Sequence, residues 1–244
     1  MIPPLFAADA ASLAGDAIVL DGAEGRHATT VRRLRPGERA DVTDGAGRVA
    51  ECVVSAAGAG RLELAVVSRR AEPPPDPQVV VVQAIPKGDR GELAVEIMTE
   101  VGVDVIVPWQ AERCVAQWRG ERAARALGRW RSAAREAGKQ SRRARFPQIA
   151  EPERLPGVAA LAGRASLAVV LDPLAGLQAG AVPLPGSGDI ILVVGPEGGL
   201  SPAEASTLAQ AGAVSVRLGP SVLRASSAGA VAAAIVLQRS RRWD

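Results

Sequence analysis

The sequence contains few of the residues that build metal centres, disulfide frameworks or aromatic clusters. Its 244 residues include no tyrosine, two phenylalanines, one histidine and two cysteines. Because Cys52 and Cys114 lie far apart and only one histidine is present, the chain lacks the ligand spacing of a zinc site, and we expect no metal. Isolated cysteines without a disulfide framework are typical of buried thiols in a reducing compartment, so we expect a cytoplasmic protein.

Long apolar runs and an N-terminal targeting segment are also missing. The longest apolar runs are far shorter than the ~20 residues of a membrane span. The start MIPPLFAADAASLAG lacks the basic region and the apolar core of a signal peptide. What the chain has in abundance is aliphatic: 48% of its residues are hydrophobic, mostly alanine, valine and leucine, which excludes wholesale disorder. The length fits one large domain or two modest ones.

The net charge of +3 is small but unevenly distributed. Between Arg113 and Arg145 there are eleven basic and two acidic residues, a local charge of +9, so the rest of the chain carries −6. Basic charge confined to one segment is typical of proteins that bind polyanions. The alternative is a solvated helix face without a ligand.

The basic segment is expected to be a helix with two faces. Its apolar stripe consists of Ala123, Ala126, Leu127, Trp130, Ala134 and Ala137. Its exposed stripe is predicted to consist of Arg131, Arg135, Lys139 and Arg142. Because these basic residues have no acidic partner one turn further on, we expect them to face RNA or DNA.

The clearest boundary in the chain is AEPPPDP at residues 71–77, a stiff and extended linker. Before it, short β-type runs alternate with turns. The runs are 17–21, 38–44, 48–55 and 61–68, with a hairpin turn at 44–47. Residues 1–70 are therefore predicted to form a small β-barrel.

After the linker, the pattern changes to near-continuous runs of valine, isoleucine and leucine. These runs are 79–85, 103–108, 167–172, 189–194 and 213–218. Such runs indicate strands covered on both faces, hence a parallel sheet. Helical segments such as GELAVEIMTEVG, at 91–102, lie between them. Residues 78–244 are predicted to form an α/β domain.

The sharpest local pattern is DIILVVGPEGGLSPAE, at residues 189–204, where a buried strand runs into a turn rich in glycine. A helix then opens with Ser201 as N-cap, Pro202 at its first position and Glu204 closing a capping box. Open α/β proteins bind ligands at this edge of the sheet. The turn has neither the Walker lysine nor the dinucleotide fingerprint, so a plain strand-to-helix turn is the alternative.

A second unusual segment is VRLGPSVLRASSAGAVAAAIVLQ, at residues 216–238. A strand ends at Leu218 and Gly219, a loop follows, and Arg224 comes just before an alanine-rich helix. Ser226 and Ser227 are predicted to cap that helix or to bond a ligand. An ordinary cap beside a surface arginine is the alternative.

GPEGGLSPAE followed by LGPSVLRASSA resembles the last two motifs of the SPOUT methyltransferases, whose sheet is tied in a trefoil knot. More narrowly, the chain resembles the bacterial RsmE family, which methylates N3 of one uridine in 16S ribosomal RNA. Further matching segments are RHATTVRRLRPGE (26–38), residues 81–115 and AGKQSRRARFP (137–147). The resemblance implies a PUA-like β-barrel that helps bind RNA, S-adenosylmethionine as cofactor, the small ribosomal subunit as partner, and a homodimer.

The resemblance also implies the site residues. The cofactor-binding residues would be Leu171, Asp172, Pro173, Gly195, Pro196, Glu197, Gly198, Gly199, Leu200, Leu218, Gly219, Leu223 and Ser227. Arg224 would stabilise the anionic uracil or orient its phosphate, and Glu197 would supply a carboxylate or bond the loop. The RNA-binding residues would be His27, Arg32, Arg33, Arg35, Lys87, Arg113, Lys139, Arg142 and Arg143.

The chain departs from this family at two places. Lys139 stands where the family commonly has glutamate, and Ala225-Ser226-Ser227 stands where it commonly has Thr-Glu-Thr. These departures argue against a mechanism that needs a carboxylate at the start of the last helix. Two alternatives stay open: a SPOUT enzyme that methylates ribose 2′-oxygens, and an RNA-binding protein that has lost catalysis.

Overall fold

In the computed structural model, which describes residues 2–243, the chain divides into two compact units. The first contains the chain up to Pro74 together with Gly138–Phe146, and the second contains Pro75–Ala137 and the chain from Pro147 on. The predicted ranges did not include Gly138–Phe146 in the first unit. This segment belongs there because Thr43 Oγ1 donates to the Ala144 carbonyl (2.9 Å) and Arg145 Nη2 donates to the Glu72 carbonyl (2.7 Å).

The first unit is built on a five-stranded sheet with the order β1-β3-β4-β5-β2. Its strands are β1 (Leu5–Ala7), β2 (Ala17–Leu20), β3 (Arg39–Thr43), β4 (Arg48–Gly58) and β5 (Arg61–Ala71). Only β1 and β3 run parallel. The four predicted strands are confirmed, and β1 is an addition. The predicted linker begins one residue later than expected, because Ala71 still pairs with Arg48 at the end of β5.

A short helical stretch completes the first unit: α1 (Gly22–Arg26) continues into a π-helical turn at His27–Val31. The core beneath it is made of aliphatic side chains and one aromatic ring, with Phe6, Ile18, Leu62 and Leu64 almost fully buried. Cys52 is buried in the same core, and burial raises the pKa of its thiol to about 11.

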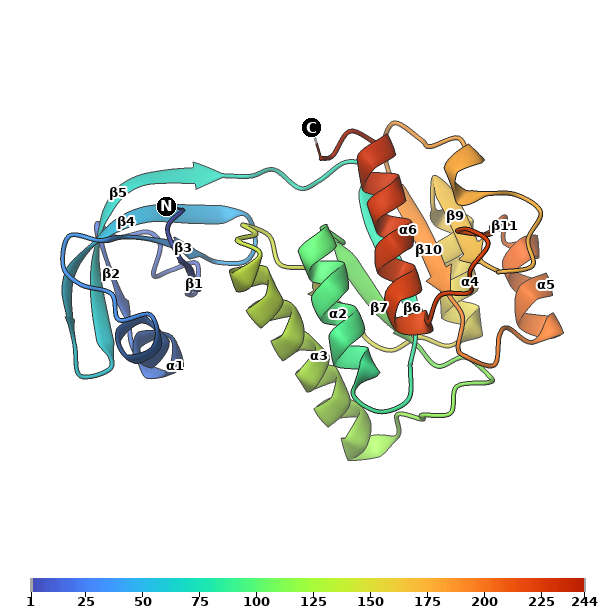
Figure 1. Cartoon of the computed structure of the whole chain (residues 1–244), viewed down its shortest axis with the longest axis horizontal. Coiled ribbons are helices and arrows are strands. Elements are labelled where there is room, and N and C mark those ends of the chain that lie inside the picture. Colours follow the sequence, from blue (N-terminus) through green and yellow to red (C-terminus); the bar gives the residue numbers. More distant parts are fainter. Residues whose placement is uncertain (1, 244) are drawn as a thin grey trace. The chain divides into compact units, whose positions relative to one another are not determined.

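The second unit is built on a six-stranded parallel sheet with the order β11-β9-β10-β6-β7-β8 (Figure 1). Its strands are β6 (Gln78–Ala84), β7 (Val105–Trp109), β8 (Gln148–Ile149), β9 (Leu167–Leu171), β10 (Asp189–Val194) and β11 (Val214–Val216). The five predicted strands are confirmed, and all pairs run parallel, as their continuous apolar runs indicated. The two-residue β8 was not predicted.

Helices cover both faces of this sheet. One face packs against α2 (Arg90–Val101), α3 (Gly120–Gln140) and α6 (Ala225–Arg239), and the other against α4 (Leu155–Arg164) and α5 (Pro202–Gln210). Successive residues of β6 alternate between the two cores, with Val79 and Val81 in the first and Val80 and Val82 in the second. A 3-10 turn at Ala179–Ala181 precedes β10. Across residues 2–243, no helix combines the length and the apolar character needed to cross a membrane.

Candidate active site

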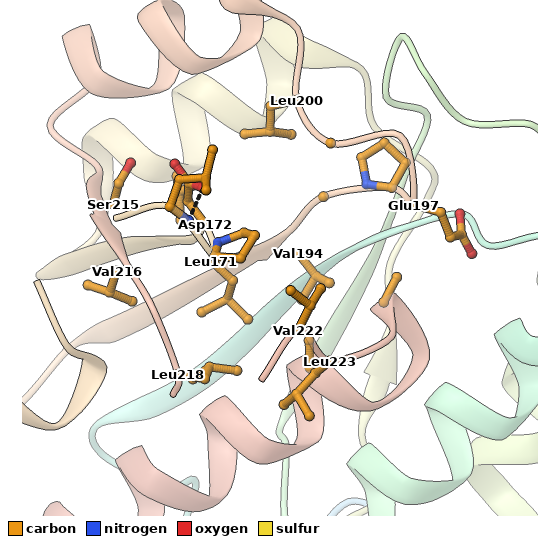
Figure 2. A pocket seen from close by; sticks show the side chains of 18 of the residues that line it. Leu171, Asp172, Val194, Glu197, Leu200, Ser215, Val216, Leu218, Val222 and Leu223 are labelled. Carbon is orange, nitrogen blue, oxygen red and sulfur yellow. Dashed lines mark hydrogen bonds between the residues drawn. The ribbon is translucent and has the colours of Figure 1, made fainter. Parts of the chain in front are cut away.

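A cavity of about 630 Å³ opens where β9, β10 and β11 end (Figure 2). Because these strands are parallel, their following loops meet at the same edge of the sheet. The loops at Asp172–Leu174, Gly195–Leu200 and Leu218–Arg224 contribute most of the wall, and the first turn of α6 closes it with Ala225 and Ala228. The two motifs that stood out in the sequence therefore line one cavity.

The glycine loop after β10 is shaped by close packing and by one left-handed residue. A Cβ atom on Gly195 would lie 3.1 Å from Cδ2 of Leu200, so a side chain there would require Leu200 to shift. Gly199 has a φ of 71° and donates from its N–H to the Pro196 carbonyl (2.9 Å). Close packing therefore favours glycine at 195, and the left-handed backbone favours it at 199.

The helix after this loop begins as predicted. The Ser201 Oγ accepts a hydrogen bond from the Glu204 backbone N–H (3.3 Å), and Glu204 Oε2 accepts one from the Ser201 N–H (2.8 Å). Pro202 occupies the first position of α5. This capping box fixes the point at which the loop ends and α5 starts.

The loop after β9 is held by its own aspartate. The Asp172 N–H donates to the Val216 carbonyl at the end of β11 (2.8 Å), and Asp172 Oδ1 accepts from the Leu174 N–H (2.9 Å). The carboxylate therefore orders the turn in which Pro173 and Leu174 face the cavity. Asp172 has a structural task whether or not a ligand is bound.

The last helix begins without a side-chain cap. Arg224 occupies the N-cap position with extended backbone, and its carbonyl accepts from the N–H groups of Ser227 (3.0 Å) and Ala228 (2.9 Å). The prediction that Ser226 and Ser227 cap α6 is wrong, because both lie inside its first turn. Ser226 is buried, and Ser227 Oγ donates back to the Arg224 carbonyl (3.3 Å).

Four charged residues line the cavity: Arg113, Asp172, Glu197 and Arg224. Among residues 2–243, the side chains of Arg224 and Glu197 form neither an ion pair nor a hydrogen bond, and both are exposed. Figure 2 shows the Glu197 carboxylate at the edge of the group, pointing away from Leu171 and Val194. Arg113, which comes from the loop after β7, was predicted to bind RNA and not to line the cofactor cavity.

The predicted cofactor-binding residues come together almost completely. All of them line the cavity except Gly198, whose carbonyl accepts from Arg113, and Ser227, which lies within α6. Apolar residues that the motifs did not single out complete the wall: Val170, Leu174, Val194, Val216, Val222 and Ala228. Val216 and Val194 end their strands, so they could have been found from the strand predictions.

The predicted RNA-binding residues are more scattered. Arg32, Arg33 and Arg35 are exposed on the first unit, and His27 packs edge-to-face against Phe6 with ring centres 5.9 Å apart. On the second unit, Lys87 is exposed in the loop after β6. The segment after α3 carries the exposed Arg142, whose Nη1 donates to the Pro3 carbonyl (2.7 Å), and the half-buried Arg143.

Five of the six residues of the predicted apolar stripe are buried and Ala123 is half-buried, but the polar stripe differs from the prediction. Lys139 is buried and its Nζ lies 2.6 Å from Glu24 Oε1, so the prediction that it belongs to the exposed stripe is wrong. Two arginines of the helix also have acidic partners from other elements: Arg129 with Glu92 (2.6 Å) and Arg131 with Glu151 (2.7 Å). Only acidic residues one turn along the same helix entered the sequence-based prediction, so it could not identify Glu92 and Glu151.

Comparison with known proteins supplies the family. A family model described as an RNA methyltransferase domain matches residues 73–237, and one described as an RNA methyltransferase PUA domain matches residues 20–67. The chain is 46% identical over 248 residues to ribosomal RNA small subunit methyltransferase E of Mycobacterium tuberculosis, covering 100% of this chain and 95% of the relative.

Solved structures of similar proteins support the same family. The structure of ribosomal RNA small subunit methyltransferase E from Neisseria gonorrhoeae bound to S-adenosyl methionine is 26% identical, with a TM-score of 0.85 over 98% of both chains. A putative methyltransferase from Legionella pneumophila, 24% identical with a TM-score of 0.86 over 98% of both chains, has the same fold. The predicted fold class, a parallel-sheet α/β domain preceded by a PUA-like domain, is confirmed, while the trefoil knot stays a prediction. The chain therefore belongs to the ribosomal RNA small subunit methyltransferase E family.

Proposed function

We propose that this protein transfers a methyl group from S-adenosylmethionine to N3 of one uridine in 16S ribosomal RNA. The observation that carries this proposal is the cavity formed by the loops after β9, β10 and β11, in a chain of this family. The structure of the Neisseria relative was solved with S-adenosyl methionine bound. The substrate would be the small ribosomal subunit or its RNA, and by family resemblance the enzyme would act as a homodimer.

The cavity fits such a cofactor in size and in chemistry. Its volume of about 630 Å³ is within the range of sites for small molecules. Leu171, Val216, Leu218 and Leu223 supply an apolar end suited to an adenine ring, and the loops supply backbone groups for its polar edge. S-Adenosylmethionine, when bound, supplies an electrophilic methyl group on a sulfonium centre.

The residues of the chain must then bind and orient the acceptor. Because N3 of uracil lies on the base-pairing edge, the uridine has to be unpaired or flipped out before it enters the site. Its ring must also be held in line with the methyl group. As N3 loses its proton to solvent water, negative charge develops on the uracil ring, so a positively charged donor beside the ring would lower the barrier.

Arg224 is the candidate for this donor. Its guanidinium is permanently charged, lines the cavity and has no partner within residues 2–243. It also stands at the N-terminus of α6, where the helix dipole favours negative charge. Glu197 is less suited to accept the N3 proton, since its carboxylate points away from the cavity centre in Figure 2; we assign it to the rim of the site.

The first unit would contribute RNA affinity. Arg32, Arg33 and Arg35 follow the helical turn at His27–Val31 and are exposed, so they can contact phosphates without reading sequence. Arg142, in the first unit, and Lys87, in the second, are further exposed candidates. Lys139 is excluded from this role by its burial.

The test is methylation of purified small subunits, or of naked 16S RNA, with isotopically labelled S-adenosylmethionine. The products are digested to nucleosides and identified by mass, and the methylated nucleotide is mapped in cells with and without the gene. A methyl group on N3 of uridine supports the proposal. A methyl group on ribose would favour the 2′-O-methylating alternative, and absence of cofactor binding would favour an RNA-binding protein without catalysis.

A further inference from the structure

The loop that follows β7 contacts the glycine loop at Gly198 and the first turn of α5 at Glu204. We propose that Arg113 and Glu204 are positioning residues that hold Gly195–Leu200 in the shape that binds the cofactor. The inference rests on the proposed function, but neither residue was among those expected to bind the cofactor. Neither residue needs to contact the reacting atoms to have this effect.

Glu204 makes the first contact. The residue is only 3% exposed, and among residues 2–243 no basic side chain forms an ion pair with it. Instead its two oxygens accept hydrogen bonds from two separate segments: Oε2 from the Ser201 N–H (2.8 Å) and Oε1 from the Glu112 N–H (2.7 Å). A buried carboxylate is costly unless it is hydrogen-bonded, so both bonds are needed to keep it in place. The capping box of α5 therefore also fastens the loop after β7.

Arg113 makes the second contact, from the next residue along the chain. Its Nη1 donates to the Gly198 carbonyl (3.0 Å), and its Cβ lies 3.3 Å from the point where a Gly198 Cβ would be. Gly198 therefore presents its backbone to Arg113 at close range. Through these two hydrogen bonds, the loop after β7 holds the middle of the glycine loop at Gly198 and the first turn of the helix that follows it at Glu204.

The glycine loop needs such support because it has little of its own. Within Gly195–Leu200, one backbone hydrogen bond is present, from Gly199 to Pro196. Glycines restrict the backbone least, so a loop of this composition would sample many backbone conformations without contacts from other elements. The loop after β7 is itself ordered: Gln110 Nε2 donates to the Ala116 carbonyl (3.0 Å), and Gln110 Oε1 accepts from the Trp118 N–H (3.0 Å). It can therefore act as a rigid support.

The experiment measures S-adenosylmethionine binding to the full chain by calorimetry, for wild type, Arg113→Ala and Glu204→Gln. Loss of one charge-assisted hydrogen bond should raise the Kd about tenfold in Arg113→Ala. Glu204→Gln keeps the shape but retains one acceptor oxygen for two N–H groups, so its Kd should rise at least as much. Arg119→Ala is the matched control, because Arg119 is an exposed arginine of the same segment that does not line the cavity. Its Kd should stay within twofold of wild type.

A kinetic measurement separates positioning from catalysis and from RNA contact. For Arg113→Ala, the KM for S-adenosylmethionine should rise about tenfold while kcat at saturating cofactor falls less than threefold. A raised KM for RNA with an unchanged cofactor Kd would overturn the inference and would support the original prediction that Arg113 binds RNA. If Glu204→Gln does not fold, the exposed Arg113 decides the question alone. Wild-type protein that fails to bind the cofactor would refute the proposed function. Normal cofactor binding by both variants would refute only the inference that Arg113 and Glu204 hold the glycine loop.

Discussion

The burial of Lys139 leads to a stability prediction that can be worked out from the structure. Lys139, near the end of α3, and Glu24, on α1, form an ion pair of 2.6 Å inside the first unit, with side chains 5% and 17% exposed. The perturbation is Lys139→Met, which keeps the length and volume of the side chain but removes the ammonium group. The carboxylate of Glu24 then stays buried without its counter-ion.

The size of the effect follows from this geometry. Removing one member of a buried ion pair costs about 3–5 kcal/mol, because the other charge is left uncompensated. Glu24 Oε2 already has no hydrogen-bond partner within residues 2–243, while the remaining exposure of the side chain lets water reach part of it. We therefore take the lower end, about 3 kcal/mol, which reduces the folding equilibrium constant of the first unit on the order of a hundredfold.

The assay has to distinguish the two units. All four tryptophans, Trp109, Trp118, Trp130 and Trp243, belong to the second unit, so their fluorescence in urea reports that unit alone. Amide hydrogen exchange of peptides from β4 and β5 reports the opening free energy of the first unit. Lys139→Met should lower that free energy and leave the fluorescence transition close to that of wild type.

Two further variants test whether the loss of stability in Lys139→Met comes from the uncompensated charge of Glu24. Arg39→Met breaks the exposed Arg39–Glu51 pair of the same unit, whose side chains are 62% and 33% exposed, and should cost less than about 1 kcal/mol. Lys139→Met combined with Glu24→Met replaces the pair by apolar side chains and should recover most of the loss. A loss below about 1 kcal/mol in Lys139→Met, or a double variant as unstable as the single one, would contradict the uncompensated-charge argument.

Three other predictions test the site, the RNA surface and a buried thiol. Arg224→Ala should reduce kcat about a hundredfold, as loss of one transition-state donor does, with the Kd of S-adenosylmethionine unchanged; unaltered turnover would remove Arg224 from the chemistry. Arg32→Glu with Arg35→Glu should weaken RNA binding and reduce the slope of log K against log salt by about 1 for each phosphate that the protein no longer neutralises, in a filter-binding titration; an unchanged slope would mean that this face does not bind RNA. Burial raises the pKa of Cys52 to about 11, so native protein at pH 8 should resist alkylation there until it is unfolded in urea. The same shift implies that native stability declines as pH rises from about 9, where the thiol ionises in the unfolded chain, towards about 11, and a flat profile would count against it.

Local patterns in the sequence were sufficient to predict the parallel sheet and the glycine loop. Runs such as 79–85 and 189–194 carry apolar residues on both faces, which is a property of each strand by itself. The capping box of Ser201 and Glu204 is equally local, and it set the start of α5 at the correct residue. Both predictions depend on residues close together in the chain.

Interactions between distant parts of the chain were beyond such signals. β1 and β8 have three and two residues, and each exists only because it pairs with a strand brought beside it by the fold. Helical periodicity placed Lys139 on the polar side of α3, but it could not show that Glu24, 115 residues away, takes its charge out of solvent. Arg113 likewise joins the cavity through tertiary structure, since the motif that contains it lies in another βα unit.

The small residues of α6 connect the packing of the second unit to its site. A Cβ atom on Gly229 would lie 3.1 Å from both Met98 Sδ and Val81 Cγ1, so α6 packs tightly against α2 and β6 at this glycine. One residue earlier, Ala228 lines the cavity. A larger side chain at 229 would require Met98, Val81 or α6 itself to shift, and a shift of α6 would carry its first turn with it. Since that turn carries Arg224, the position of the proposed catalytic guanidinium is set by packing inside the core as much as by the loop that precedes it.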